Sequence, residues 1–280
     1  MRRGTYGLVL GLIATVMAIA AVLIMPAVAG AWAPAKTAPI HPGVQTFTQG
    51  GQCTANFIFK EGDAVFVGQA AHCSGTGGQT ETDGCTSGSL PLGTAVEVTG
   101  AKQPGTLVYN SWLAMQEAGE ANPNACAYND LALVRLAAAD VASVNPSVPG
   151  FGGPTGVGTV GSLGATVYSY GNSELRGGIT KLSPKQGIVI QNEGNGWSHN
   201  VLTLTPGIPG DSGSGFLNGS GAAFGVLSTL QLAPLPATNG VGDLGRELAY
   251  ARSHSQFTDV QLVPGTEPFK ANLFGAILGS

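Results

Sequence analysis

Residues 207–215 read GIPGDSGSG and place one serine, Ser212, between glycines and directly after an acid, Asp211. Glycine adopts backbone angles that other residues reach only with strain, so a serine on such a turn can point its hydroxyl outward. The N–H groups of Gly210 and Ser212 can then converge on one point, as an oxyanion hole requires. The stretch predicts either a nucleophile loop or an ordinary glycine turn. A base and an orienting acid elsewhere in the chain would decide between the two.

A serine hydroxyl is a poor nucleophile near neutral pH and needs a base. His72 follows an apolar strand, in the sequence QAAHC at 69–73. The other histidines lie in polar or Pro-rich surroundings and are expected to be solvent or turn residues; they are His41, His199 and His254.

A histidine base works best when a carboxylate fixes its tautomer. Asp130 opens the alternating segment DLALVRL at 130–136, where apolar neighbours keep water scarce. A buried acid in that setting is costly without a partner. Taken alone, Asp130 is equally explained as a cap of the turn before this strand, so both readings stay open.

The segments GQAAHC, NDLALVRL and GDSGSG, in this order, resemble the His, Asp and Ser motifs of the trypsin/chymotrypsin-like serine proteases. The small exported bacterial members are the most similar in style. The resemblance implies an all-β fold of two antiparallel six-stranded β-barrels with a short C-terminal helix. It also implies a catalytic triad in which His72 is general base and then acid, Asp130 orients it and Ser212 forms the acyl-enzyme. The N–H groups of Gly210 and Ser212 would bind the oxyanion.

The same resemblance places Pro206, six residues before the serine, at the base of the primary specificity pocket. Pro206 supplies no acid that would select Lys or Arg. Ser228, Thr229 and Leu230 fall on the strand that forms the pocket wall, and the leucine stands where glycine is usual. We therefore expect a serine endopeptidase that cleaves after small or apolar residues. Asp243, on the following segment, is the one acid expected within reach of the pocket.

Two features depart from the family pattern. Gly213-Ser214-Gly215 follows the nucleophile where Gly-Gly-Pro is usual. Members of the family commonly pair the acid before the nucleophile with a freed N-terminus, but no basic cleavage site precedes Ile40. We therefore expect an arginine to pair with Asp211, and Arg176 is a candidate.

The first 29 residues have the pattern of a signal peptide. Two arginines precede an apolar run over 8–25, and the AVA sequence at 27–29 offers a cleavage site of small residues. The apolar run is long enough to span a bilayer, so an uncleaved membrane anchor is the alternative. Both readings place the rest of the chain outside the cytoplasm, and the preferred one is secretion. Residues 30–50 are rich in Ala, Pro and Gly and are expected to be a linker that leads into the first barrel.

The composition excludes several classes of partner. The net charge is -4, only 10% of residues are charged, and Lys and Arg are scattered, so no nucleic-acid partner is expected. The chain has four histidines and no C-x-x-C pair, so neither a metal nor a cofactor is expected. We expect a monomer that acts on protein or peptide substrates and contacts a membrane only through an uncleaved N-terminal segment.

Four cysteines in an exported protein suggest two disulfides. A tight turn at 61–63 folds the apolar strands on either side into a hairpin. This hairpin brings Cys53 opposite Cys73, within reach of a disulfide. The second bridge, Cys85–Cys126, follows by elimination.

Abundant glycine (44 residues) together with 43% hydrophobic residues favours many short strands joined by turns. The Pro- and Gly-rich stretch at 145–158 is the best internal boundary, which predicts a first barrel over 51–150 and a second barrel with its helix and tail over 151–280. A helix is predicted over 246–253 and one helical turn over 115–120. Strands are predicted over 53–60, 64–69, 94–98, 106–110, 131–136, 165–170, 187–191, 200–205 and 222–230.

One rival interpretation is a catalytically silent relative, a protease-like binding module at the cell surface. Loss of a triad residue would normally mark such a protein, and all three residues are present in this chain. A changed pocket or oxyanion geometry would also silence the enzyme, so a chemical probe of Ser212 is needed to separate the two.

Overall fold

The computed structural model describes residues 32–78, 82–231 and 238–279. The predicted signal peptide, its cleavage site and the first two residues of the linker lie outside these ranges. Within them, no helix has the length and apolar character needed to cross a membrane.

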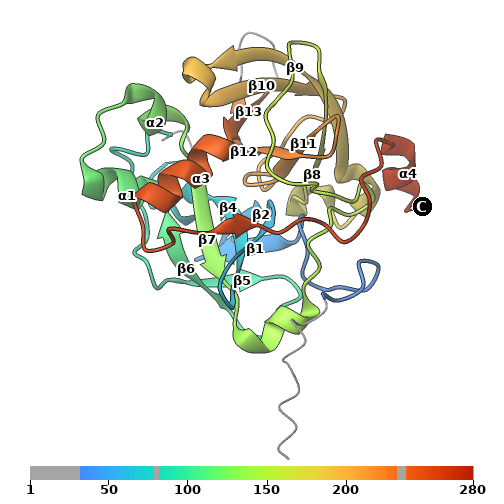
Figure 1. The fold of residues 1–280 in the computed structure, drawn as a ribbon, viewed down its shortest axis with the longest axis horizontal. Helices are drawn as coiled ribbons and strands as arrows, with labels where there is room; N and C mark the ends of the chain where they lie inside the picture. The colour runs from blue at the N-terminus through green and yellow to red at the C-terminus, as the bar shows by residue number, and fades with distance from the viewer. Residues whose placement is uncertain (1–31, 79–81, 232–237, 280) are drawn as a thin grey trace, which may run out of the picture. The chain divides into compact units, whose positions relative to one another are not determined.

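The first half of the chain forms an eight-stranded antiparallel sheet in the order β14-β3-β4-β7-β6-β5-β1-β2 (Figure 1). Seven of its strands come from the first half, and the eighth, β14, returns from near the C-terminus to pair with β3. The strands are β1 (Gln45–Thr48), β2 (Gly51–Thr54), β3 (Ile58–Glu61), β4 (Ala64–Ala70), β5 (Ala95–Val98), β6 (Gly105–Asn110), β7 (Leu131–Arg135) and β14 (Gln261–Leu262).

The second half forms a closed antiparallel barrel of six strands in the order β10-β13-β12-β11-β8-β9. The strands are β8 (Thr166–Tyr170), β9 (Pro184–Glu193), β10 (Ser198–Thr203), β11 (Gly215–Asn218), β12 (Ala223–Gln231) and β13 (Thr238–Asp243). Alternate residues of these strands point inward and fill the barrel with a small apolar core. This core consists of Val167, Val189, Val201, Phe216, Phe224, Leu227 and Val241.

Four α-helices flank the two sheets: α1 (Ser111–Ala118), α2 (Pro123–Tyr128), α3 (Leu244–Ser253) and α4 (Leu273–Leu278). The short 3-10 helices are η1 (Ala71–Ser74), η2 (Ala138–Ser143), η3 (Glu174–Arg176), η4 (Thr180–Leu182) and η5 (Gly194–Gly196). Helix α3 begins where the Asp243 side chain accepts the N–H of Arg246, a standard N-cap. It contacts β7 of the first sheet and both β12 and β13 of the barrel (Figure 1). The helix therefore bridges the two halves of the chain.

The predicted fold class is confirmed, and so are the predicted strands of both halves to within a few residues. The single strand predicted over 53–60 is wrong: the chain forms β2 and β3 instead, with residues 55–57 between them. The predicted turn at 115–120 is part of the longer helix α1. Strands β1, β11, β13 and β14 and helices α2 and α4 were not predicted.

The domain boundaries stay a prediction, with two observations that bear on them. Strand β1 begins at Gln45, inside the segment expected to be linker. The sequence does not predict this strand, because the apolar alternation of QTFT is too short to indicate one. Strand β14 lies in the range assigned to the second barrel but pairs with the first sheet.

Both predicted disulfides are confirmed. Cys53–Cys73 has a sulfur–sulfur distance of 2.05 Å, and Cys85–Cys126 is also closed. The two cysteines of the Cys53–Cys73 disulfide are not opposite each other on one hairpin, which differs from the geometry that the sequence predicts. Cys53 lies in β2, which pairs with β1, and Cys73 lies in the 3-10 helix η1 that follows β4.

Candidate active site

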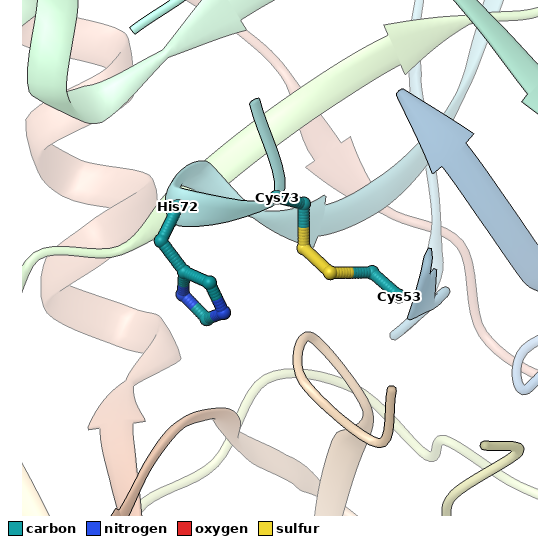
Figure 2. A group of neighbouring side chains, drawn as sticks. All are labelled: Cys53, His72 and Cys73. Carbon is teal, nitrogen blue, oxygen red and sulfur yellow. A yellow bond between two sulfur atoms is a disulfide. The ribbon is translucent and has the colours of Figure 1, made fainter. Parts of the chain in front are cut away.

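His72 lies on η1, directly after the buried strand β4. The next residue, Cys73, is tied to β2 by the disulfide with Cys53, so the backbone beside the imidazole is anchored covalently (Figure 2). The His72 side chain is 26% exposed, whereas its neighbours Ala71 and Cys73 are buried. This position gives the ring one protected edge and one edge open to a ligand.

Asp130 holds the imidazole on its protected edge. Its Oδ2 lies 2.7 Å from His72 Nδ1, and its Oδ1 accepts the backbone N–H of His72 at 2.9 Å. Asp130 is only 3% exposed. The predicted pairing is therefore present, and the alternative reading of Asp130 as a turn cap does not describe its contacts. Because the carboxylate accepts a hydrogen bond from the Nδ1–H group, the imidazole keeps Nε2 as its free basic nitrogen.

The pKa of His72 is raised above its ordinary value of 6.5. Burial of the ring disfavours the charged imidazolium and lowers the pKa, but the charge of Asp130 and its hydrogen bond act in the opposite direction and outweigh burial. An imidazole stabilised in its protonated form is suited to take a proton during a reaction and return it later.

Two further groups contact Asp130. The Ser228 hydroxyl donates to Asp130 Oδ2 at 2.6 Å, so one residue expected in the pocket wall also supports the acid. The backbone N–H of Asp130 donates to Oε1 of Glu247, at 3.0 Å. Sequence reasoning missed Glu247 because it lies on a helix 117 residues further along the chain, and nothing local marks it as buried.

The Ser212 loop packs against the same part of the first sheet. Its carbonyl accepts the N–H of Thr54 in β2 at 2.8 Å. Gly213 has a φ of +85°, and a Cβ placed on it would lie 2.8 Å from the N atom of Ala70, at the end of β4. Only glycine allows this close approach. The loop of the second barrel is therefore held against the strand that leads directly into His72.

Besides the buried Ser214 hydroxyl, three groups of this loop make no hydrogen bond within the described ranges: the Ser212 hydroxyl, the Ser212 N–H and the Gly210 N–H. The rest of the loop is tightly paired. The Gly213 N–H donates to Leu227, and the Gly210 carbonyl accepts from Thr54 Oγ1 at 2.8 Å. The Ser212 hydroxyl and the two N–H groups predicted to face a substrate are thus among the unpaired groups of the loop, whereas the unpaired Ser214 hydroxyl is fully buried.

Asp211 is fully buried and pairs with two cations. Arg176 donates to its Oδ2, which confirms the expected arginine partner. Lys185 Nζ lies 3.1 Å from the same oxygen and is itself fully buried. Burial lowers the pKa of Lys185, and the charge of Asp211 opposes that shift. These ion pairs occupy Asp211 with side chains from η3 and β9.

The sequence does not predict a role for Lys185, because a lone lysine beside a predicted strand is a weak signal. Its ammonium also donates to the carbonyl of Pro206 at 3.0 Å. The buried cation therefore ties together Asp211 and the residue predicted at the base of the specificity pocket.

The residues predicted around the pocket lie on two neighbouring segments. Pro206 is exposed, and the next residue, Gly207, donates its N–H to the Asn239 side chain at 2.9 Å. A Cβ placed on Gly207 would lie 2.8 Å from Leu230 Cδ2. The Leu230 side chain therefore reaches across from β12 to the segment before the serine. Thr229 pairs with Gly240 in the same strand ladder and is partly buried.

Asp243 does not serve the predicted pocket through its carboxylate. One oxygen accepts the N–H of Arg246 as the cap of α3, and the other lies 3.1 Å from Nε2 of His199. The prediction for His199 is wrong. It is buried in β10 and packs edge-on against Phe224, because the polar residues around it form a strand rather than a turn.

The other two histidines lie nearer the surface. His41 is partly buried, and its Nδ1 lies 2.7 Å from the carbonyl of Pro42. Burial lowers the pKa of His41, and that contact opposes the shift. His254 is exposed and stacks on Tyr250, as expected of a histidine outside the core.

Two clusters in the described ranges bring together groups of the kind that bind metals: Cys53, His72 and Cys73, and Asp83, Cys85 and Cys126. In both clusters the sulfurs are joined in a disulfide. A disulfide sulfur is not the thiolate that a metal requires.

Comparison with solved structures identifies the architecture. The chain superposes on Thermobifida fusca Protease A with a TM-score of 0.52 and 19% identity, covering 81% of this chain and 99% of that protein. The chain has the chymotrypsin-like fold.

Two further chymotrypsin-like neighbours score 0.48 at 18% identity: Nocardiopsis Protease (NAPase) and Cellulomonas bogoriensis chymotrypsin. In each case the alignment covers 80% of this chain and 98% of the other. No family model and no curated protein sequence matches the chain. Superposition on Thermobifida fusca Protease A covers 81% of this chain, so the resemblance of the three short motifs extends to most of the chain at the level of the fold.

Proposed function

We propose that the protein is a secreted serine endopeptidase with His72, Asp130 and Ser212 as its catalytic triad. The observation that carries this proposal is the 2.7 Å contact between Asp130 and His72 Nδ1. It leaves Nε2 as the free nitrogen of the imidazole, and the Ser212 loop packs against the end of β4, the strand that leads into His72. The unpaired N–H groups of Gly210 and Ser212 support an oxyanion hole on that loop.

The proposed reaction has two stages. His72 Nε2 takes the proton of the Ser212 hydroxyl as its oxygen bonds to the substrate carbonyl carbon, and the negative charge moves to the carbonyl oxygen. The two N–H groups of the loop stabilise that charge. His72 then gives its proton to the leaving amine as the peptide C–N bond breaks, which leaves an acyl-enzyme. His72 next takes a proton from water as the water oxygen bonds to the acyl carbon, and returns it to the Ser212 oxygen as the ester C–O bond breaks, which releases the carboxylic acid product and restores Ser212.

Location outside the cytoplasm is supported by the N-terminal sequence pattern and by the two disulfides, which are typical of oxidising compartments. The pairing of Asp211 with Arg176 and Lys185 supports a site that forms without a freed N-terminus, since the acid already has buried cationic partners. The substrates we propose are proteins or peptides.

The test of this function is reaction with a fluorophosphonate probe, which bonds to an activated serine. We expect the folded protein to be labelled once, with the adduct mapped by mass spectrometry to Ser212. Protein that retains its folded circular dichroism spectrum and its disulfides but takes up no label would support the rival, a catalytically silent binding module. The Ser212 hydroxyl makes no hydrogen bond in the described ranges, but catalytic hydrogen bonds commonly tighten only when substrate binds.

For the cleavage preference, we propose small or apolar side chains before the scissile bond. The contact of Leu230 with the Gly207 segment supports a shallow pocket, because the leucine occupies space between the two walls. Replacing Leu230 with glycine is expected to raise kcat/KM for Leu or Phe at that position by about 10-fold or more relative to Ala, the scale set by small differences in an apolar pocket. Cleavage profiling with a peptide library measures the change.

A matched control is Leu204→Gly. Leu204 is 76% exposed and lies shortly before Pro206, so its loss removes an apolar side chain without opening the space between Gly207 and Leu230. The profile of this variant should match that of the unmodified protein. A clear preference of the unmodified protein for Lys or Arg would contradict the interpretation of Pro206.

A further inference from the structure

A second carboxyl group lies behind the acid of the proposed triad. Glu247 is in the first turn of α3 and is fully buried. Its Oε1 accepts the backbone N–H of Asp130 at 3.0 Å, while the Asp130 carbonyl accepts the N–H of Ala71 at 2.9 Å. The peptide groups on both sides of the Asp130 side chain are therefore held, one by α3 and the other by the segment that carries His72.

The barrel leaves room for this carboxyl at one position. A Cβ placed on Gly242 in β13 would lie 2.5 Å from Glu247 Oε1 and 3.1 Å from the carbonyl of Tyr128. Only glycine at that position lets the helix, the barrel and the chain before Asp130 meet around the carboxyl. The arrangement brings three separate parts of the sequence together around one carboxyl group: α3, β13 and the chain before Asp130.

The surroundings of Glu247 shift the pKa of its carboxyl group upward. Burial raises its pKa well above the ordinary value; the Asp130 N–H lowers it, and the charges of Asp130 and Asp243 raise it further. Its Oε2 and the hydroxyl of Tyr109 have no hydrogen-bond partner among the described residues. Burial raises the pKa of Tyr109 well above its ordinary value, and the charges of Glu247 and Tyr250 raise it further.

We propose that Glu247 is a positioning residue for the triad: as a hydrogen-bond acceptor from α3, it fixes the peptide of Asp130 and thereby the contact between Asp130 and His72. This inference rests on the proposed function. Its physical basis is that a carboxylate orients an imidazole only as well as its own backbone is fixed. Without the acceptor, the buried Asp130 N–H has no partner, and the peptide is free to rotate toward another one.

Two substitutions separate the hydrogen bond from the charge. Glu247→Gln keeps an acceptor oxygen of the same reach, and we expect kcat to stay within about threefold of the unmodified protein. Glu247→Leu fills a similar volume without an acceptor. We expect it to lower kcat about 100-fold, the cost of a displacement of about 1 Å at a catalytic group, with little change in KM.

A spectroscopic measurement reads the positioning directly. The proton between His72 Nδ1 and Asp130 Oδ2 is expected to give a low-field NMR signal in the unmodified protein and in Glu247→Gln. In Glu247→Leu, we expect that signal to shift upfield or broaden away. This readout needs no turnover. A protein that shows it and is not labelled by the fluorophosphonate would contradict the proposed function but not the role of Glu247.

Gly242→Ala is the second variant and keeps Glu247 in the chain. Its methyl group displaces the carboxyl, so it should lower kcat and perturb the NMR signal as Glu247→Leu does, even if the latter does not fold. Leu248→Ala is the control for lost stability, because Leu248 is buried on the same helix and makes no contact with Asp130 that would be lost. It should lower the melting temperature and leave kcat and the signal unchanged. The proposal is overturned if Glu247→Gln loses as much activity as Glu247→Leu, or if Gly242→Ala leaves both readouts unchanged.

Discussion

Replacing Ser212 with alanine is expected to lower kcat by about 10⁶ and to abolish labelling by a fluorophosphonate. The proposed reaction needs an oxygen that bonds to the substrate carbon, and alanine offers none. Losses of this size accompany removal of the nucleophile in triad enzymes, with the remaining rate supplied by binding and the oxyanion hole. The Ser212 hydroxyl makes no hydrogen bond among the described residues, so its removal should leave the melting temperature nearly unchanged. Steady-state kinetics and thermal unfolding measure the two effects.

The matched control is Ser214→Ala, two residues away in the same loop. Ser214 is fully buried, and its hydroxyl has no partner among the described residues, so alanine fits without an unmet hydrogen bond. Its activity should stay within a few-fold of the unmodified protein. Equal losses in the two variants would mean that the loop had been disturbed as a whole, and full activity in Ser212→Ala would exclude Ser212 as the nucleophile.

The sequence predicts well those residues of the site that lie in local sequence motifs. His72 and Asp130 each lie at the end of an apolar segment whose alternation marks a strand, and Ser212 lies among glycines. Family resemblance supplied the order of the three motifs, and the structure then brought His72 and Asp130 to 2.7 Å. Arg176 could be predicted as a partner of Asp211, because a buried acid next to the serine needs a cation beside it.

The groups that the sequence does not reveal act through contacts over long separations. Glu247 has the appearance of a solvent-facing residue in RELAYARS, and only the crossing of α3 over both halves of the chain makes it buried. The burial of Lys185 and Asn239 is not predicted for the same reason. Nothing in the neighbouring sequence indicates that a polar residue of a barrel strand is buried. His199 was assigned to a turn for the same reason: Trp197-Ser198-His199-Asn200 is polar, yet it begins β10.

Glycine-rich strands were also difficult to predict. Strand β13 reads TNGVGD, with one apolar side chain between two glycines, and this sequence resembles a turn. In the folded protein, Gly242 of that strand provides room for the Glu247 carboxyl and for the chain before Asp130. Glycine in this strand allows separate parts of the fold to pack closely, and no local pattern of hydrophobic residues predicts such packing.

Replacing Asp130 with asparagine is expected to lower kcat by about 10⁴ near neutral pH, the second largest effect. The amide has nearly the same shape and keeps one oxygen. It no longer provides a charged acceptor at both His72 positions, the backbone N–H and Nδ1. If the amide nitrogen faces Nδ1, it donates to that atom, so the ring carries its proton on Nε2 and cannot accept the proton of Ser212.

The pH dependence gives this prediction a second readout. His72 acts as a base only when it is neutral, so kcat/KM of the unmodified protein should rise with pH through a midpoint above 6.5, since Asp130 raises the His72 pKa against the effect of burial. In Asp130→Asn that charge is absent, burial alone remains, and the His72 midpoint should move below 6.5. Ser228→Ala is the control, because it removes one hydrogen bond of 2.6 Å to Asp130 and keeps the charge. Its loss should be about 10-fold, in line with a hydrogen bond to a charged group. An Asp130→Asn protein with activity within 10-fold of the unmodified protein and the same midpoint would show that Asp130 does not orient the base.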